Sequence, residues 1–87
     1  METTMTNASS LLDAFRNNPR TRYPAVLVRQ DGSEDEVTIT EYTSNGFRVA
    51  VSLRPQLGER VLLRVAGVTD RPALICWAYG AEAGGSH

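Results

Sequence analysis

Two short segments of the sequence carry side chains whose types and spacing suit the binding of an anion. Arg16, Arg20 and Arg22 follow one another closely in FRNNPRTRY, where Pro19 stiffens the chain between the first two arginines. Guanidinium groups form bidentate bonds to phosphates and flat contacts with base edges, so such a cluster can grip an anion or a planar base. The second segment, EYTSNG at residues 41–46, places an acid and two hydroxyls directly before an Asn-Gly pair.

Each segment also has a purely structural interpretation. The three arginines can be solvated charges on a linker, and EYTSNG can be a plain hairpin turn. In that turn, Asn45 and Gly46 would supply the positive φ that a type I′ turn needs, with Thr43 and Ser44 as turn formers. Taken singly, each segment favours the structural explanation.

The rest of the sequence offers little for catalysis. His87, the only histidine, stands in a Gly-rich segment, which argues against a histidine-based triad or metal centre. The acidic run SEDE, residues 33–36, lacks the alternating oxygen ligands and central glycine of a calcium loop, and we interpret it as a solvated cluster that protects a sheet edge. No Walker or dinucleotide glycine motif is present. We therefore expect no enzymatic activity, no cofactor and no metal.

The net charge and the cysteine content limit which partners and which cellular compartment we expect for the protein. The net charge is −1, so the chain lacks the basic excess of a general nucleic-acid binder. The single Cys76 cannot form an intramolecular disulfide, and we predict a buried thiol in a reducing cytoplasm. The N-terminal residues do not resemble a signal peptide, and no apolar run is long enough to span a membrane. We expect a cytoplasmic protein with neither a membrane nor a nucleic-acid partner.

The first predicted element is a short helix in SSLLDAFRN. Ser10 is placed to cap it, and Leu11, Leu12 and Phe15 share one face. A helix of this length is not stable alone and must dock on another element. Residues 1–8 before it are predicted to be flexible.

Period-two alternation of apolar residues predicts five strands in the remainder of the chain. These are AVLVRQ, the segment around Val37 and Ile39, the run from Phe47 to Leu53, RVLLRVA and ALICWAYG. The predicted inward-facing side chains of the last three strands are Phe47, Val49, Val51 and Leu53, then Val61, Leu63 and Val65, then Ile75, Trp77 and Tyr79.

Spacing of about ten residues between these strands, with short turns, predicts an antiparallel meander that curls into a barrel. We expect an all-β fold, a small antiparallel β-barrel of five to six strands with a short N-terminal helix. The barrel domain would cover residues 9–80, and residues 81–87 would be a flexible tail.

The order of these features resembles the PilZ domain family over about residues 15–85. The pair Arg16 and Arg20 has R-x-x-x-R spacing before the first strand, and an acid-x-hydroxyl-x-x-Gly turn at residues 41–46 follows about twenty residues later. LRPQLGERVLLRV looks like the family's strand, Pro-Gly turn and following strand. ALICWAYGAEAGG is similar to its late Trp-containing strand and Gly-rich approach to the last segment.

The resemblance implies a six-stranded antiparallel barrel that binds the bacterial second messenger cyclic di-GMP. Arg16 and Arg20 would contact the phosphates and guanine edges of the ligand. Glu41, Thr43 and Gly46 match the family's D-x-S-x-x-G turn, in which the acid and hydroxyl bind guanine and the glycine lets the backbone approach the ligand. The protein would be a receptor that passes the signal to a downstream protein partner.

The sequence departs from the family pattern at several points. Glu41 replaces Asp, which moves the carboxylate by about 1.5 Å, whereas Thr43 replaces Ser and keeps the hydroxyl. The second motif arginine is Arg20 by its spacing from Arg16, or Arg22 by its distance from the first strand. The chain also stops early, so the last barrel strand is expected to be missing or to come from the N-terminal segment.

Two classes of function therefore remain open. One is the cyclic di-GMP receptor, and the other is a degenerate PilZ-like module that binds no nucleotide and serves as a protein-interaction adaptor. An exposed apolar patch, together with arginines held in internal salt bridges, would indicate the adaptor. A nucleic-acid-binding barrel is disfavoured by the near-neutral charge and by the six aromatic residues, most of which have core spacing.

Overall fold

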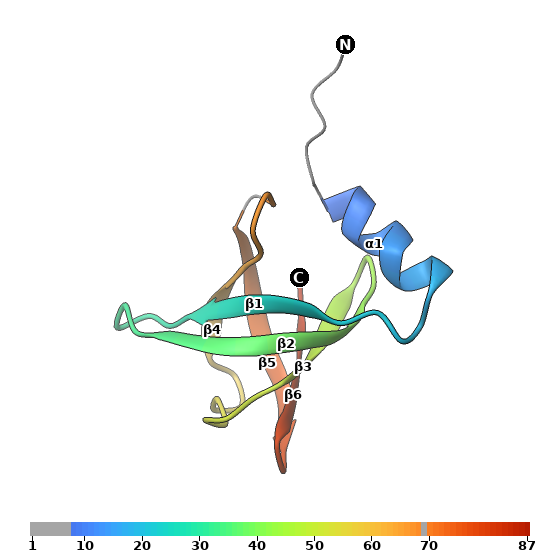
Figure 1. The fold of residues 1–87 in the computed structure, drawn as a ribbon. Coiled ribbons are helices and arrows are strands. Elements are labelled where there is room, and N and C mark those ends of the chain that lie inside the picture. Colours follow the sequence, from blue (N-terminus) through green and yellow to red (C-terminus); the bar gives the residue numbers. More distant parts are fainter. Residues whose placement is uncertain (1–7, 69) are drawn as a thin grey trace.

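The strands of the chain close into one antiparallel barrel in a computed structural model that describes residues 8–68 and 70–87 (Figure 1). In space the strands follow the order β1-β2-β3-β6-β5-β4, and β4 pairs with β1 to complete the ring. The elements in chain order are α1 (Ala8–Asn17), β1 (Tyr23–Val28), β2 (Glu34–Tyr42), β3 (Gly46–Ala50), β4 (Arg60–Arg64), β5 (Arg71–Tyr79) and β6 (Glu82–Ser86).

This architecture confirms the prediction of a small all-β barrel with a short helix. The simple meander is wrong, because β3 pairs with β6 and the chain crosses from β3 to β4 before it returns through β5. The predicted flexible N-terminus falls almost entirely on residues 1–7, which lie outside the described residues. Within the described part of the chain, no helix is long and apolar enough to cross a membrane.

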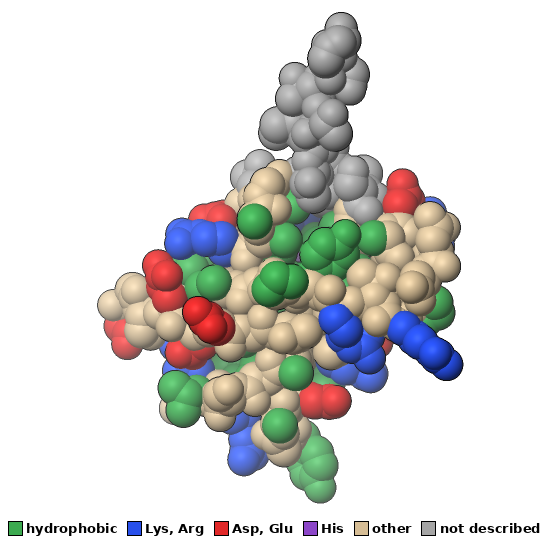
Figure 2. Space-filling model, viewed as in Figure 1, with side chains coloured by type: hydrophobic (Ala, Val, Ile, Leu, Met, Phe, Trp, Pro, Cys, Tyr) green, Lys and Arg blue, Asp and Glu red, His purple; other side chains and the backbone are tan. Residues whose placement is uncertain are grey.

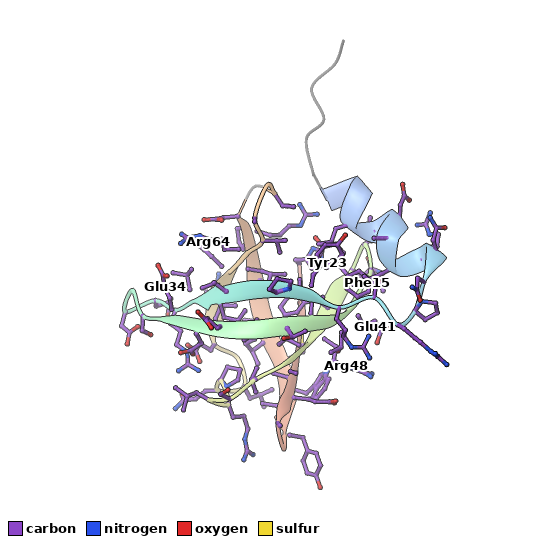
Figure 3. All side chains as sticks on the ribbon, in the orientation of Figure 1. Phe15, Tyr23, Glu34, Glu41, Arg48 and Arg64 are labelled. Atoms are coloured by element: carbon purple, nitrogen blue, oxygen red, sulfur yellow. The ribbon has the colours of Figure 1, made fainter. Side chains whose placement is uncertain are left out.

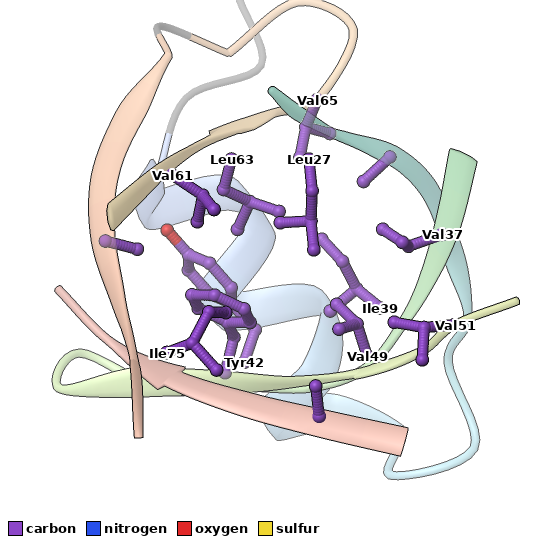
Figure 4. Close-up of a cluster of buried hydrophobic side chains, with 14 of the residues drawn as sticks. Leu27, Val37, Ile39, Tyr42, Val49, Val51, Val61, Leu63, Val65 and Ile75 are labelled. Atoms are coloured by element: carbon purple, nitrogen blue, oxygen red, sulfur yellow. The ribbon is translucent and has the colours of Figure 1, made fainter. Parts of the chain in front are cut away.

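The interior of the barrel is filled by alternate side chains of the strands, as Figure 4 shows. Ile39 and Val49 are fully buried, and they face each other across the β2 and β3 pairing. The predicted inward positions on β4 are also correct, since Val61 and Leu63 are buried. Leu53 is an exception, because β3 ends at Ala50 and Leu53 is 65% exposed in the loop beyond it.

Helix α1 docks beside the turn between β2 and β3 (Figure 1). Leu11 and Phe15 are buried, while Leu12 is partly buried against the same core, which confirms the predicted apolar face. The ring of Phe15 lies 5.7 Å from that of Tyr23 and 6.5 Å from that of Tyr42, measured between centroids. The helix begins at Ala8, so Ser10 lies inside the helix and not at its cap.

The sixth strand comes from the segment predicted to be a flexible tail. Residues 82–86 form β6 between β3 and β5, so the last strand is neither missing nor supplied by the N-terminal segment. Its glycines serve close packing. A Cβ at Gly84 would overlap the indole ring of Trp77, and one at Gly85 would lie 2.7 Å from Cζ of Phe47. Larger residues at either position would force neighbouring side chains to move.

The outer surface of β5 differs from the prediction. The pairing of β5 with β6 shifts register between Ile75 and Trp77, so Ile75 is buried whereas Trp77 is 38% exposed. Tyr79 is 81% exposed, and Cys76 is an exposed free thiol. The predicted common face for Ile75, Trp77 and Tyr79 is wrong, because a bulge breaks strict alternation after Ile75. The predicted buried thiol is also wrong, since alternation from the buried Ile75 turns Cys76 outward.

Candidate ligand-binding site

The turn between β2 and β3 is shaped by the hydroxyl of Thr43. Its Oγ1 accepts hydrogen bonds from the backbone N–H groups of Asn45, at 3.2 Å, and Gly46, at 3.1 Å, and donates one to the carbonyl of Gly46 at 3.2 Å. The backbone N–H of Thr43 also donates to the carbonyl of Gly46 at 2.8 Å. Neither Asn45 nor Gly46 has positive φ, so the type I′ interpretation is wrong. The turn is instead held by the hydrogen bonds of the Thr43 hydroxyl to the backbone of residues 45 and 46.

Arg16 and Arg22 flank the segment that joins α1 to β1. Arg16 lies in the last turn of α1, 3.7 Å from the Asp13 carboxylate, and both side chains are mostly exposed. The Nη1 group of Arg22 donates to the carbonyls of Thr21 at 2.8 Å and Pro19 at 3.4 Å. Both guanidinium groups therefore retain unused donors that face solvent.

A hollow of about 610 Å³ opens between α1, the segment after it and the end of β2. Leu12, Phe15 and Tyr42 contribute apolar surface, and three arginines face two glutamates around it. Figure 2 shows arginine side chains gathered over the loop that follows α1. The residues that line the hollow are Leu12, Phe15, Arg16, Pro19, Arg22, Thr40, Glu41, Tyr42, Thr43, Ser44, Arg48 and Glu82.

The structure brings together four of the six predicted site residues. Arg16, Arg22, Glu41 and Thr43 line this hollow. Gly46 lines a smaller neighbouring hollow of about 270 Å³, which Glu41 and Thr43 also border. Arg20 is exposed and lines neither hollow, although its backbone N–H donates to Oδ1 of Asn18 at 3.0 Å.

Arg48 is a site residue that the sequence reasoning missed. It lies opposite Glu41 in the pairing of β3 with β2, and its Nη2 lies 3.5 Å from Oε1 of Glu41 (Figure 3). Its guanidinium carbon lies 5.8 Å from the centroid of the Trp77 ring, within the range of a cation–π contact. Arg48 borders both hollows. The sequence did contain a sign of this role, because alternation in the strand after the turn places Arg48 on the outer face.

His87 packs beneath the turn and does not belong to a flexible tail. Its ring stacks on those of Tyr42, at 5.1 Å, and Phe47, at 5.9 Å between centroids. Its backbone N–H donates to the carbonyl of Asn45 at 3.0 Å, and Nε of Arg71 donates to its Nδ1 at 2.9 Å. Burial, and secondarily the positive charge of Arg71, lower the pKa of His87 below its usual value. The neutral imidazole therefore supports the turn.

The acidic run at residues 33–36 belongs to a second charged region. Residues 34–36 pair with β1 on one side, whereas the pairing of β2 with β3 begins only at Thr38, so the other side of this segment has no paired strand. Asp35 lies 2.9 Å from Nε of Arg29, and its side chain is only 16% exposed. Glu34 lies 3.3 Å from Nη1 of Arg64. The interpretation of this run as a solvated cluster is therefore wrong for Asp35, whose ion pair with Arg29 is shielded, whereas Ser33, Glu34 and Glu36 are exposed.

Comparison with known proteins adds no family assignment: no family model matches the chain, and no curated protein matches it. In the described residues, no group of three or more His, Cys, Asp or Glu side chains is arranged to hold a metal ion. The chemistry available in the larger hollow is that of guanidinium, carboxylate and hydroxyl groups over an apolar floor.

Proposed function

We propose that the larger hollow binds a small anionic nucleotide, and that this nucleotide is cyclic di-GMP. The observation that carries the proposal is that two segments about twenty residues apart place Arg16, Arg22, Glu41 and Thr43 around one opening. Arginine suits phosphate, and a carboxylate accepts hydrogen bonds from N1 and N2 of guanine. The protein is then a PilZ-like receptor in bacterial second-messenger signalling, which passes the signal to a protein partner.

The size and surface of the hollow support a ligand of this class. Its volume of about 610 Å³ lies within the range of small-molecule sites. Leu12, Phe15 and Tyr42 give the hollow only a small apolar surface, since the two aromatic rings are buried, while Thr40 and Ser44 supply hydroxyls at the rim.

Ligand binding requires an exchange of partners at Glu41. Its carboxylate faces Arg48 at 3.5 Å, with side-chain exposures of 55% and 49% respectively. An ion pair this exposed contributes about 1 kcal/mol or less. A guanine that donates two hydrogen bonds to Glu41 can therefore displace the pair and free the Arg48 guanidinium for contact with the ligand.

Isothermal titration with cyclic di-GMP tests the proposal. We expect saturable binding at nucleotide concentrations up to about 100 µM, weakened by added salt because the contacts are ionic. GMP serves as a control that has the same base and only one phosphate. The absence of binding heat, together with the absence of chemical-shift changes at this concentration, would overturn the proposal.

Glu41→Asp sharpens the assignment of the turn. The shorter acid restores the Asp of the family's D-x-S-x-x-G pattern, and we expect affinity to stay equal or improve, by up to roughly tenfold. The dissociation constant from the same titration gives the answer. A large loss of affinity would show that the site is fitted to the longer acid.

The adaptor remains a second candidate because two observations favour it. Leu74, Trp77 and Tyr79 are exposed on the outer surface of β5. Arg16 and Arg22 already have internal partners in a carboxylate and in backbone carbonyls. An adaptor would show no nucleotide binding, and Tyr79→Ser would weaken its protein complex.

A further inference from the structure

Four residues form one transverse row across the outside of the barrel. Glu41 pairs with Arg48 between β2 and β3, Arg48 pairs with Gly84 between β3 and β6, and Gly84 pairs with Trp77 between β6 and β5. The row therefore runs from the acid of the proposed site to the only tryptophan of the chain. Arg48 and Trp77 both have exposed surface, at 49% of the side chain and 38% of the residue respectively.

The indole ring of Trp77 is held in place by the glycine of this row. A Cβ at Gly84 would overlap Nε1 and Cε2 of the ring, so the ring lies against the backbone of β6. On the side towards the site, the Arg48 guanidinium carbon is 5.8 Å from the ring centroid, and Nη2 is 3.5 Å from Glu41. The Arg48 guanidinium is thus within cation–π range of the Trp77 ring, and both groups border the smaller hollow.

We propose that Arg48 and Trp77 form a stacking shelf that receives a planar base of the nucleotide. This inference rests on the proposed function and extends its site from the larger hollow onto the outer face of β5. Bases stack on indole rings and on guanidinium planes, and such stacking tolerates different base identities. The shelf would hold the second base of a ligand whose first base is bound by Glu41. It therefore selects a nucleotide with two bases over one with a single base.

Tryptophan fluorescence tests the shelf directly, because Trp77 is the only tryptophan. We expect cyclic di-GMP to quench the emission with the same dissociation constant that calorimetry reports. Trp77→Leu should weaken binding by about 5- to 100-fold, the range found for loss of one stacked base, while Trp77→Phe should retain most of the affinity. Tyr79→Leu is the matched control, since it removes an exposed aromatic ring from the same strand, and its affinity should not change.

Gly84→Ala provides a test that removes no aromatic group. The added Cβ must displace the ring of Trp77, so we expect a loss of affinity similar to that of Trp77→Leu. Circular dichroism and thermal unfolding establish whether each variant is folded. Where a variant does not fold, the emission of the unaltered protein at saturating nucleotide decides the question.

The possible results separate this inference from the proposed function. Calorimetric binding with unquenched Trp77 emission, or with an unchanged dissociation constant in folded Trp77→Leu, would overturn the shelf and leave the nucleotide receptor standing. No binding to the unaltered protein would overturn both. Quenching, together with losses in both Trp77→Leu and Gly84→Ala, would support the shelf.

Discussion

The two ends of β2 use the same residue type in opposite ways (Figure 3). At the end near Glu34, Arg29 lies between Asp35 and Glu59, at 2.9 and 3.5 Å, and Arg64 lies between Glu34 and Asp70. We call this the paired end. Each of its arginines has two carboxylates, and the hydrogen bond and charge of Asp70 are the main causes that raise the pKa of Arg64.

At the end near Glu41, the arginines have fewer partners. Arg16 and Arg48 each face one carboxylate, at 3.7 and 3.5 Å, and among the described residues Arg22 has only backbone carbonyls. The side chains of the Arg29 cluster are at most 23% exposed, whereas that of Arg16 is 72% exposed. Arg29 at the paired end is therefore committed to the fold, while the arginines at the site end can accept an anion.

The largest expected effect is a loss of stability in Arg29→Ala. The substitution leaves Asp35 and Glu59 close together and shielded from water, without their cation. Breaking a fully buried pair costs about 3–5 kcal/mol, and partial exposure reduces the expected loss here to about 2–3 kcal/mol. Urea unfolding measures it. Arg54→Ala, at an exposed arginine, is the control and should have little effect. Equal free energies of unfolding for the two variants would contradict a structural role for the arginine at the paired end.

The next effect is on binding in Arg22→Ala. Removal of one charged contact should weaken cyclic di-GMP by about tenfold or more, with little change in the free energy of unfolding. Titration calorimetry measures the loss. Arg20→Ala is the matched variant: the family pattern predicts a strong loss there, whereas the geometry of the hollow predicts a smaller one. A strong loss only in Arg20→Ala would reassign the second arginine.

The smallest effect is a pH dependence from His87 beneath the site. Its pKa is lower in the folded protein, so in a window around the ordinary histidine pKa of about 6.5 the unfolded chain binds more protons. The free energy of unfolding should therefore decrease as the pH falls through this window. Urea unfolding at several pH values measures the slope. His87→Gln keeps an acceptor for Arg71 and should flatten the slope; an unchanged slope would show that another group titrates.

The barrel could be predicted because most of its core residues are apolar residues that alternate with polar ones along the strands. Val49 and Leu63 lie where a period of two places them. The sixth strand could not be predicted, since β6 has glycines where strands usually carry large apolar residues. Gly84 and Gly85 have no side chain, which leaves room for the rings of Trp77 and Phe47 to pack against the backbone of β6. The bulge after Ile75 left no sequence signal, and it reversed the direction of Trp77.

The site was predictable in its segments and not in its details. Arg16, Glu41 and Thr43 meet in one hollow because α1 docks beside the turn. The choice between Arg20 and Arg22 depended on the path of the chain after the helix, which spacing alone does not determine. Arg48 was missed because its importance depends on its cross-strand position opposite Glu41.

An NMR titration of ¹⁵N-labelled protein with cyclic di-GMP compares the two ends in one measurement. We predict progressive shifts for the amides of residues 43–46, for the side chain of Arg22 and for the indole N–H of Trp77. The resonances of Arg29 and Asp35 at the paired end should stay in place. An unchanged spectrum at saturating nucleotide, or shifts confined to the paired end, would contradict a nucleotide site at the end of β2 near Glu41.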